Sequence, residues 1–344
     1  MIRALVLLAA GVVPLAVPRV AEACAGCSNP NLPTARSDRI ALRRGQVSAT
    51  INVAATSMNV VHSEHCPDIG PICQERNEPG QLHDQDFYVG ELRPVMEVGI
   101  TDTLGVEAQV PLRLVRTAVV FRRLTGEVFT PDYQNIHHRS ETLVGIADPW
   151  LSGRGAWRLG GWSLVAKAGL TIPLGRTEPD PFALGRAGQP HQHIQHGTGT
   201  LNPVLGLDIG RAFDRFQLSA YGQTLLFLYE NGHGYQAGNR YLAGISGETN
   251  LGSNLRLGLG VDVLNEQPER WSGQVQQDGN VGRTDVLAGG LVGYAFGPIT
   301  AVLSMKVPVW QKFIDAGDGS DGGPGQLTYP AIVNVALQRT FGAP

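Results

Sequence analysis

Histidine and cysteine are the residues of this 344-residue chain whose spacing suggests chemistry. The run His191-Gln192-His193-Ile194-Gln195-His196 places three imidazoles close together, and His62 and His65 lie three positions apart beside Cys66. Imidazoles at such spacing can converge on copper, zinc or nickel. Polar loops also carry histidine as an ordinary hydrogen-bonding residue, so both readings stay open for the candidate ligands His62, His65, His191, His193, His196, Cys24 and Cys27.

The four cysteines form two pairs in the sequence. Cys66 and Cys73 flank a short stretch, and a disulfide between them is the simplest interpretation. Cys24 and Cys27 are separated by two small residues. For this pair a local disulfide, a soft-metal site for Cu(I) and a lipid anchor on Cys24 all remain open. Haem attachment would require histidine at the position of Ser28.

Motifs of the common enzyme classes do not occur in the sequence. There is no nucleophile elbow, phosphate-binding loop, dinucleotide fingerprint or His-Glu-x-x-His motif. We therefore expect no enzymatic activity and no resident cofactor, with copper or zinc as the metal that the histidines would take. A net charge of −3 argues against nucleic acid as a partner.

The first 23 residues have the features of a signal peptide. Arg3 provides a positive start, residues 4–17 are apolar, and Ala21 and Ala23 precede a cleavage site before Cys24. The apolar stretch is too short to span a bilayer, which takes about 20 residues, and no later segment reaches 18. We expect export to an oxidising compartment.

Residues 24–45 do not alternate and contain two prolines, so we expect a periplasmic extension or a plug there. As a plug, its four arginines would pair with acidic residues of an inner wall; as a tail, it would stay on the periplasmic face.

From residue 46 to 341, apolar and polar residues alternate over stretches of about ten positions. This period and length are typical of transmembrane strands, whereas strands of soluble sandwiches are shorter, at about 5–6 residues. The sequence predicts an all-β, antiparallel transmembrane β-barrel of about 12 strands, spanning 46–61, 86–100, 104–116, 140–151, 157–175, 199–213, 215–229, 240–252, 254–266, 284–297, 299–312 and 328–341.

The predicted connections alternate between short and long. Short turns fall at residues 101–103, 153–156, 214, 253 and 298, and we expect them on the periplasmic side. The long connections would be extracellular loops, and all nine histidines fall in the first four of them. This pattern predicts localisation in the bacterial outer membrane, with outer-membrane lipid as a partner.

Three short motifs resemble a known family. Residues 144–151 carry a Gly-x-x-Asp strand, residues 167–175 a lysine-bearing strand that ends in Pro-x-Gly, and residues 197–203 a Gly-Thr-Gly strand opening. Their order is similar to that of the MetA-pathway phenol-degradation family. The resemblance implies an outer-membrane barrel that transports small molecules and does not identify the solute.

One face of the predicted strands carries charges of both signs. We expect these residues to line the lumen, either as a polar conduit or as a structural plug of cross-lumen ion pairs: Glu91, Arg93, Glu97, Glu107, Arg113, Lys167, Asp208, Glu248, Arg256, Asp262 and Lys306. The leading functional hypothesis is a channel for a small solute, which would be hydrophobic or aromatic if the resemblance extends to the solute. The alternative is a surface barrel that binds transition metals through its histidine loops and its Cys-x-x-Cys.

Overall fold

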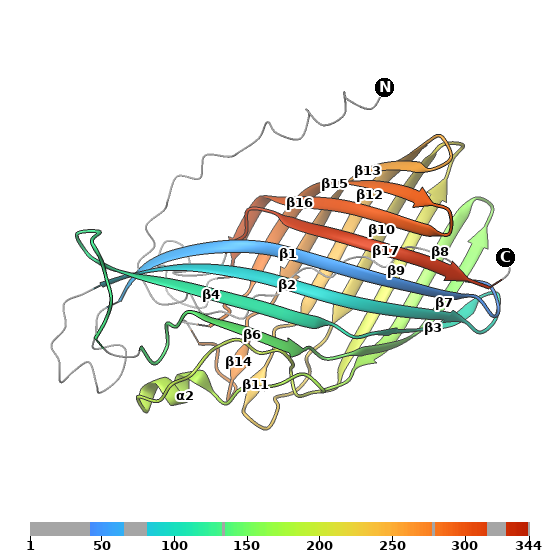
Figure 1. The fold of residues 1–344 in the computed structure, drawn as a ribbon. Coiled ribbons are helices and arrows are strands. Elements are labelled where there is room, and N and C mark those ends of the chain that lie inside the picture. The colour runs from blue at the N-terminus through green and yellow to red at the C-terminus, as the bar shows by residue number, and fades with distance from the viewer. Residues whose placement is uncertain (1–41, 65–80, 133–134, 277–278, 315–327, 343–344) are drawn as a thin grey trace.

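The chain folds into a closed antiparallel barrel of twelve strands (Figure 1). The computed structural model describes residues 42–64, 81–132, 135–276, 279–314 and 328–342. Ten of the strands are continuous: β1 (Val47–Glu64), β2 (Gln81–Gly99), β8 (Trp162–Thr171), β9 (Asn202–Ala212), β10 (Phe216–Leu225), β12 (Arg240–Leu251), β13 (Leu255–Glu266), β15 (Arg283–Phe296), β16 (Ile299–Phe313) and β17 (Ile332–Phe341).

Each of the other two strands is interrupted near its middle by a proline. Strand β3 (Leu104–Gln109) continues into β4 (Leu112–Arg123), and β6 (Glu141–Ile146) continues into β7 (Trp150–Leu159). Proline has no backbone N–H to donate to a neighbouring strand, so the ladder breaks there. The breaks lie side by side, because the Ala147 amide donates to the Pro111 carbonyl at 2.9 Å.

Strand β1 closes the barrel by pairing with both β2 and β17. Val53, for example, lies opposite Leu92 on one side and Val335 on the other. In a closed sheet no edge exposes unpaired backbone groups to lipid. The predicted fold class and strand number are therefore confirmed.

Two local predictions are wrong. The expected turn at residues 153–156 lies inside β7, and the chain reverses instead at Gly160 and Gly161, whose positive φ angles of 54° and 84° suit glycine. His62 and His83 lie in strands rather than in loops, because β1 and β2 extend beyond the predicted ends and pair these two residues.

The short turns and the described chain ends lie at one end of the barrel. Gly45 donates its amide to the Gly99 carbonyl at 2.8 Å, and Arg44 donates to Asp102 at 3.2 Å, so residues 42–45 follow this rim. The rest of the predicted extension, residues 24–41, lies outside the described residues. No helix among the described residues is long and apolar enough to cross a membrane.

Four short elements lie in the long connections, at the end of the barrel opposite the short turns. They are β5 (Val128–Phe129), α2 (Pro181–Arg186), β11 (Tyr235–Gln236) and β14 (Arg270–Trp271). Strands β11 and β14 pair with each other, and Trp271 contacts both Tyr235 and Phe182 of α2. In Figure 1, α2, β11 and β14 lie together at one side of the barrel.

Alternation along each strand gives the barrel two different faces. On β13, Leu259 is 76% exposed, whereas Asp262 is buried on the inner side. On β16, Leu303 and Met305 are exposed and the intervening Ser304 lines the lumen. The outer face is therefore apolar and suited to lipid, and the polar residues point inward.

This assignment predicts the stability of a matched pair of arginine variants. Leu259 of β13 and Met305 of β16 lie at the same depth in the wall, because both are in register with Gly290 of β15. Ser304 is the residue before Met305 and faces the lumen. Leu259→Arg places a charge in lipid near the strand centre and should lower the free energy of unfolding by about 2–4 kcal/mol. Ser304→Arg, at nearly the same depth on the inner face, should change it little. Urea unfolding in lipid vesicles measures the free energy of unfolding of both variants. Equal decreases would refute the assignment of Leu259 to the lipid face and Ser304 to the lumen face.

Candidate functional site

The charged residues predicted to line the lumen all lie on the inward face of their strands. They share the inward parity with buried neighbours and alternate with exposed apolar residues: Glu91, Arg93, Glu97, Glu107, Arg113, Lys167, Asp208, Glu248, Arg256, Asp262 and Lys306. Four ion pairs between the described residues run along the wall, joining neighbouring or next-but-one strands: Glu97 with Arg154, Glu107 with Lys167, Glu248 with Arg256 and Asp262 with Lys306.

One charge cluster lies on β2, β3, β7 and β8. Glu97 and Glu107 are cross-strand partners, an arrangement that repels when both are ionised. Arg154 pairs with Glu97, and Lys167 Nζ lies 2.7 Å from Glu107 Oε1. Arg154 was not predicted to face the lumen, because it falls in the wrongly predicted turn at residues 153–156.

A second charged group spans the opposite wall. Tyr221 of β10 donates its hydroxyl to Asp262 of β13 at 2.6 Å, and Lys306 Nζ of β16 lies 2.5 Å from the same carboxylate. Each contact passes over a glycine on the strand between. A Cβ at Gly244 would lie 2.1 Å from Asp262 Oδ1, and one at Gly289 would lie 2.9 Å from Lys306 Cγ. These glycines therefore permit the group to form.

This wall lines a cavity of about 340 Å³ in the half of the lumen near the short turns. Its lining mixes charged residues with hydroxyl and amide side chains such as Thr50, Asn52 and Ser304, and with apolar Val302 and Ile332. The volume lies within the range of small-molecule pockets, about 300–1,000 Å³.

A smaller cavity of about 90 Å³ lies toward the long loops, and its lining combines aromatic side chains with both cationic and anionic ones. Trp150, Phe227 and Tyr235 line it. Arg93 lies over the Trp150 ring at 5.5 Å and Arg240 over the Phe227 ring at 5.2 Å.

Residues 187–201, here called the lumen loop, enter the barrel and form one side of this smaller cavity. Arg113 of β4 donates from Nη1 to the Gln195 carbonyl at 3.0 Å. The Gln195 side chain accepts from the Glu178 amide at 2.7 Å. Gln195 is therefore held both by the wall and by its own connection.

Asp148, in the break between β6 and β7, is the main anchor of the lumen loop. Its carboxylate accepts hydrogen bonds from the Thr198 amide at 2.7 Å, the Thr198 hydroxyl at 2.6 Å and the Gly175 amide at 3.0 Å. Hydrogen bonds to a charged acceptor contribute about 1.5–3 kcal/mol each.

The three family-like sequence motifs meet at this anchor. Gly175 and Gly197 touch through their backbones, since a Cβ at Gly197 would lie 2.5 Å from the Gly175 carbonyl oxygen. A Cβ at Gly145 would lie 2.6 Å from the His196 ring. From the sequence, Asp148, Gly175, Gly197 and Thr198 are recognisable only as motif residues, with no predicted role.

The histidines of the run 191–196 separate into two groups. His196 points to the lumen side, where burial, with added repulsion from Arg113 and Arg176, lowers its pKa to about 4. His191 and His193 instead lie against His137, with ring centroids 4.7 Å from His137 in both cases. Burial, followed by the neighbouring His191 and His138, lowers the pKa of His193 to about 3, so both His193 and His196 are uncharged at neutral pH.

None of the other candidate ligands is found beside His137, His191 and His193 among the described residues. His65, Cys24, Cys27, Cys66 and Cys73 lie outside the described residues. His62 lies in β1, at the register position opposite His83. His137 was not predicted as a ligand, because it lies more than fifty residues before His191 and nothing in the sequence relates the two.

Comparison with known proteins places the fold. Residues 80–311 match the family described as "Putative MetA-pathway of phenol degradation". A crystal structure of an outer membrane channel from Pseudomonas putida F1 is similar, with a TM-score of 0.59 and 14% identity over 90% of this chain and all of that chain. This similarity shows the barrel fold. No match to a curated protein was found.

Two more remote solved structures also align. One is a mutant of the monoaromatic hydrocarbon channel TodX, with a TM-score of 0.39 and 10% identity over 87% of this chain and 91% of that one. The other is the Ralstonia pickettii toluene transporter TbuX, with a TM-score of 0.37 and 11% identity over 88% of this chain and 90% of that one.

The anchor makes a prediction about the lumen loop. Thr198→Val keeps the side-chain shape but removes the hydroxyl that donates to Asp148, whereas Thr198→Ser keeps it. The amides of His196 and Gly197 bond to the Arg176 carbonyl and report on the loop. They should exchange with deuterium about ten- to a hundredfold faster in Thr198→Val, from the loss of about 1.5–3 kcal/mol. Thr198→Ser should resemble the native protein; similar exchange in both variants would rule out the anchor.

Proposed function

The chain belongs to the MetA-pathway phenol-degradation family, which matches residues 80–311, and on that premise we propose that it is an outer-membrane channel for small aromatic solutes. The observation that carries the proposal is the lumen itself. It holds two cavities, of about 90 and 340 Å³, on the inner side of a closed barrel wall. A solute crossing from the loop end would meet the smaller cavity first.

The lining of the smaller cavity supports an aromatic solute. Trp150, Phe227 and Tyr235 offer rings for stacking or edge contacts, which add about 0.5–1.5 kcal/mol beyond area burial. Arg93, Arg113 and Arg240 lie beside these rings and offer hydrogen-bond donors, and Glu91 and Glu266, which pair with Arg93 and Arg240, line the same cavity. Such a lining suits a planar ring that carries a hydroxyl or another hydrogen-bond acceptor, because the ring and the acceptor are both satisfied.

The larger cavity supports onward passage rather than tight retention. Its apolar side chains are interspersed with short polar ones, and its charges are paired along the wall by Tyr221, Asp262 and Lys306. Charges paired in this way leave the centre of the lumen accessible to a neutral solute.

The test is solute flux through the purified, refolded barrel in lipid vesicles. We expect phenol or another single-ring compound to enter vesicles faster than a neutral sugar of similar size. Trp150→Ala with Phe227→Ala should reduce this preference, while Phe216→Ala, on the outer face, should not. Vesicles with the barrel that take up no solute faster than empty vesicles would refute the channel and favour the metal-binding alternative.

The wall charges predict ion selectivity. Lys306→Gln leaves Asp262 as the uncompensated charge in the larger cavity and should shift the reversal potential in a salt gradient toward cation preference. Asp262→Asn should shift it toward anions. The double variant removes both charges and should return near the native value. Planar-bilayer recordings give all three values; shifts of the same sign in both single variants would contradict the assignment.

A further inference from the structure

Three histidines from two different loops converge at the loop end of the barrel. His137 lies in the connection before β6, and His191 and His193 lie at the start of the lumen loop. Each offers one ring nitrogen, and these three atoms all lie within 4.8 Å of one another. In a tetrahedral zinc site with Zn–N of about 2.0–2.1 Å, ligand nitrogens are about 3.3 Å apart. The three nitrogens are therefore near this spacing, and rotation of the rings would bring them onto one ion.

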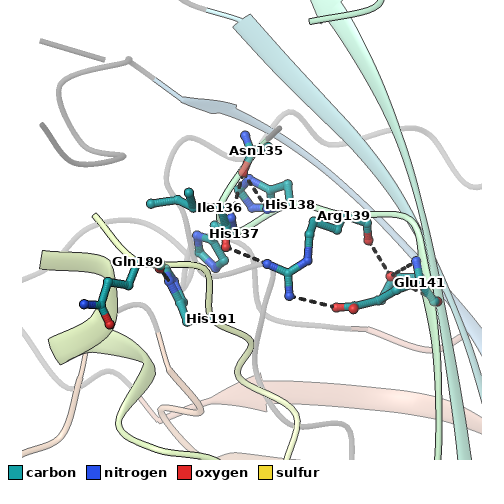
Figure 2. A network of polar contacts seen from close by, with 9 residues as sticks. Asn135, Ile136, His137, His138, Arg139, Glu141, Gln189 and His191 are labelled. Carbon is teal, nitrogen blue, oxygen red and sulfur yellow. Dashed lines mark hydrogen bonds and ion pairs between the residues drawn. The ribbon is translucent and has the colours of Figure 1, made fainter. Parts of the chain in front are cut away.

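Backbone contacts hold the two loops together at this point. The His191 amide donates to the Ile136 carbonyl at 3.0 Å. Asn135 Oδ1 accepts from the amides of His137 and His138 at 2.8 and 2.7 Å, which fixes the turn that carries His137. Figure 2 shows His137 beside His191, with Arg139 reaching back to the Ile136 carbonyl and also to Glu141. The arrangement is thus set in advance of any ligand.

The hydrogen bond of His191 assigns its tautomer. Its Nδ1 lies 2.8 Å from the Gln189 carbonyl oxygen, which can only accept, so Nδ1 carries the proton. The lone pair is therefore on Nε2. A ligating histidine commonly donates its other ring nitrogen to a backbone carbonyl in this way, which orients the ring toward the metal.

His193 is a buried polar residue whose ring nitrogens make no hydrogen bond among the described residues. The residue is 5% exposed. Phe182 packs edge-on against the ring at 4.8 Å and shields it from solvent. A buried polar group without a partner is unusual and points to a missing ligand.

We propose that His137, His191 and His193 form a binding site for a divalent transition-metal ion of the zinc, copper or nickel class. The ligand set is all imidazole, which suits these ions and disfavours calcium and magnesium, whose sites are built from oxygen ligands. Three protein nitrogens leave a coordination position for water or a solute group. Of the histidines predicted from the sequence, His191 and His193 belong to this site and His196 does not.

The first test measures metal binding and does not depend on the proposed channel function. The mature barrel, refolded in detergent and with free thiols alkylated, is titrated with Zn²⁺ against a chromophoric chelator. His193→Gln and His137→Gln should each weaken the tightest binding by at least about tenfold, because removing a ligand costs no less than removing a group that orients one. Bound Cu²⁺ should give nitrogen hyperfine structure in its paramagnetic resonance spectrum, and this signal should be reduced in the same variants.

Two matched controls keep the result specific. His233→Gln changes an exposed histidine of a neighbouring loop, and His196→Gln changes the lumen-facing histidine of the same loop. Both should bind Zn²⁺ as the native protein does. Heat-modifiable migration on gels confirms folding for every variant. Equal affinity in native protein and His193→Gln, or an equal loss in His233→Gln, would overturn the site.

A second measurement rests on the proposed function. Because the site links the lumen loop to the connection before β6, bound metal should hold the loop in place and lower single-channel conductance in native protein but not in His193→Gln. Metal binding without a conductance change would leave the site standing and refute only its coupling to the lumen. Absence of any conductance, with Zn²⁺ binding intact, would refute the channel and not the site.

Discussion

The pairing of β1 with both β2 and β17 is the constraint on which the rest of this structure depends. Closure satisfies the backbone within the wall and divides every strand into a lipid face and a lumen face. A closed wall also limits the inner volume, so the inward charges must find partners close by. They do so along the wall: Glu97 with Arg154, Glu107 with Lys167, and Asp262 with Lys306. A buried charge without such a partner would cost several kcal/mol.

Glycine decides where these inward groups can meet. Gly244 and Gly289 leave space over which Tyr221 and Lys306 reach Asp262, two strands away from each. Gly175 and Gly197 do the same for the lumen loop, since their direct backbone contact brings Thr198 to Asp148. All four of these glycines serve close approach, since none of them has a positive φ angle. The short family-like motifs can therefore be understood physically as one packing arrangement, although they are separated in the sequence.

Sequence patterning predicted the architecture well and the site only in part. A period of two residues fixes which side chains share a face, so Asp262 and Lys306 could be placed inward without a structure. The turn at 153–156 was misplaced because Gly153 and Gly155 imitate a turn signal, while the true reversal at Gly160 and Gly161 lies between two tryptophans. Loop contacts lie beyond such reasoning. Nothing in the spacing of His137 relates it to His191, and their approach depends on two connections folding against each other.

The lumen loop joins two different kinds of chemistry through a very short stretch of chain. His191 and His193 face the imidazole group at its outer end, whereas Gln195 and His196 line the smaller cavity only two residues later. A segment held by the Arg113 and Asp148 contacts at one end cannot shift at the other without straining them. A metal ion bound at the proposed site at the outer end should therefore favour one position of the inner end. By reciprocity, a solute that displaces the inner end weakens the binding of the outer ligand by the same factor. Such coupling would need only the short lumen loop between the two sites and no longer path through the barrel.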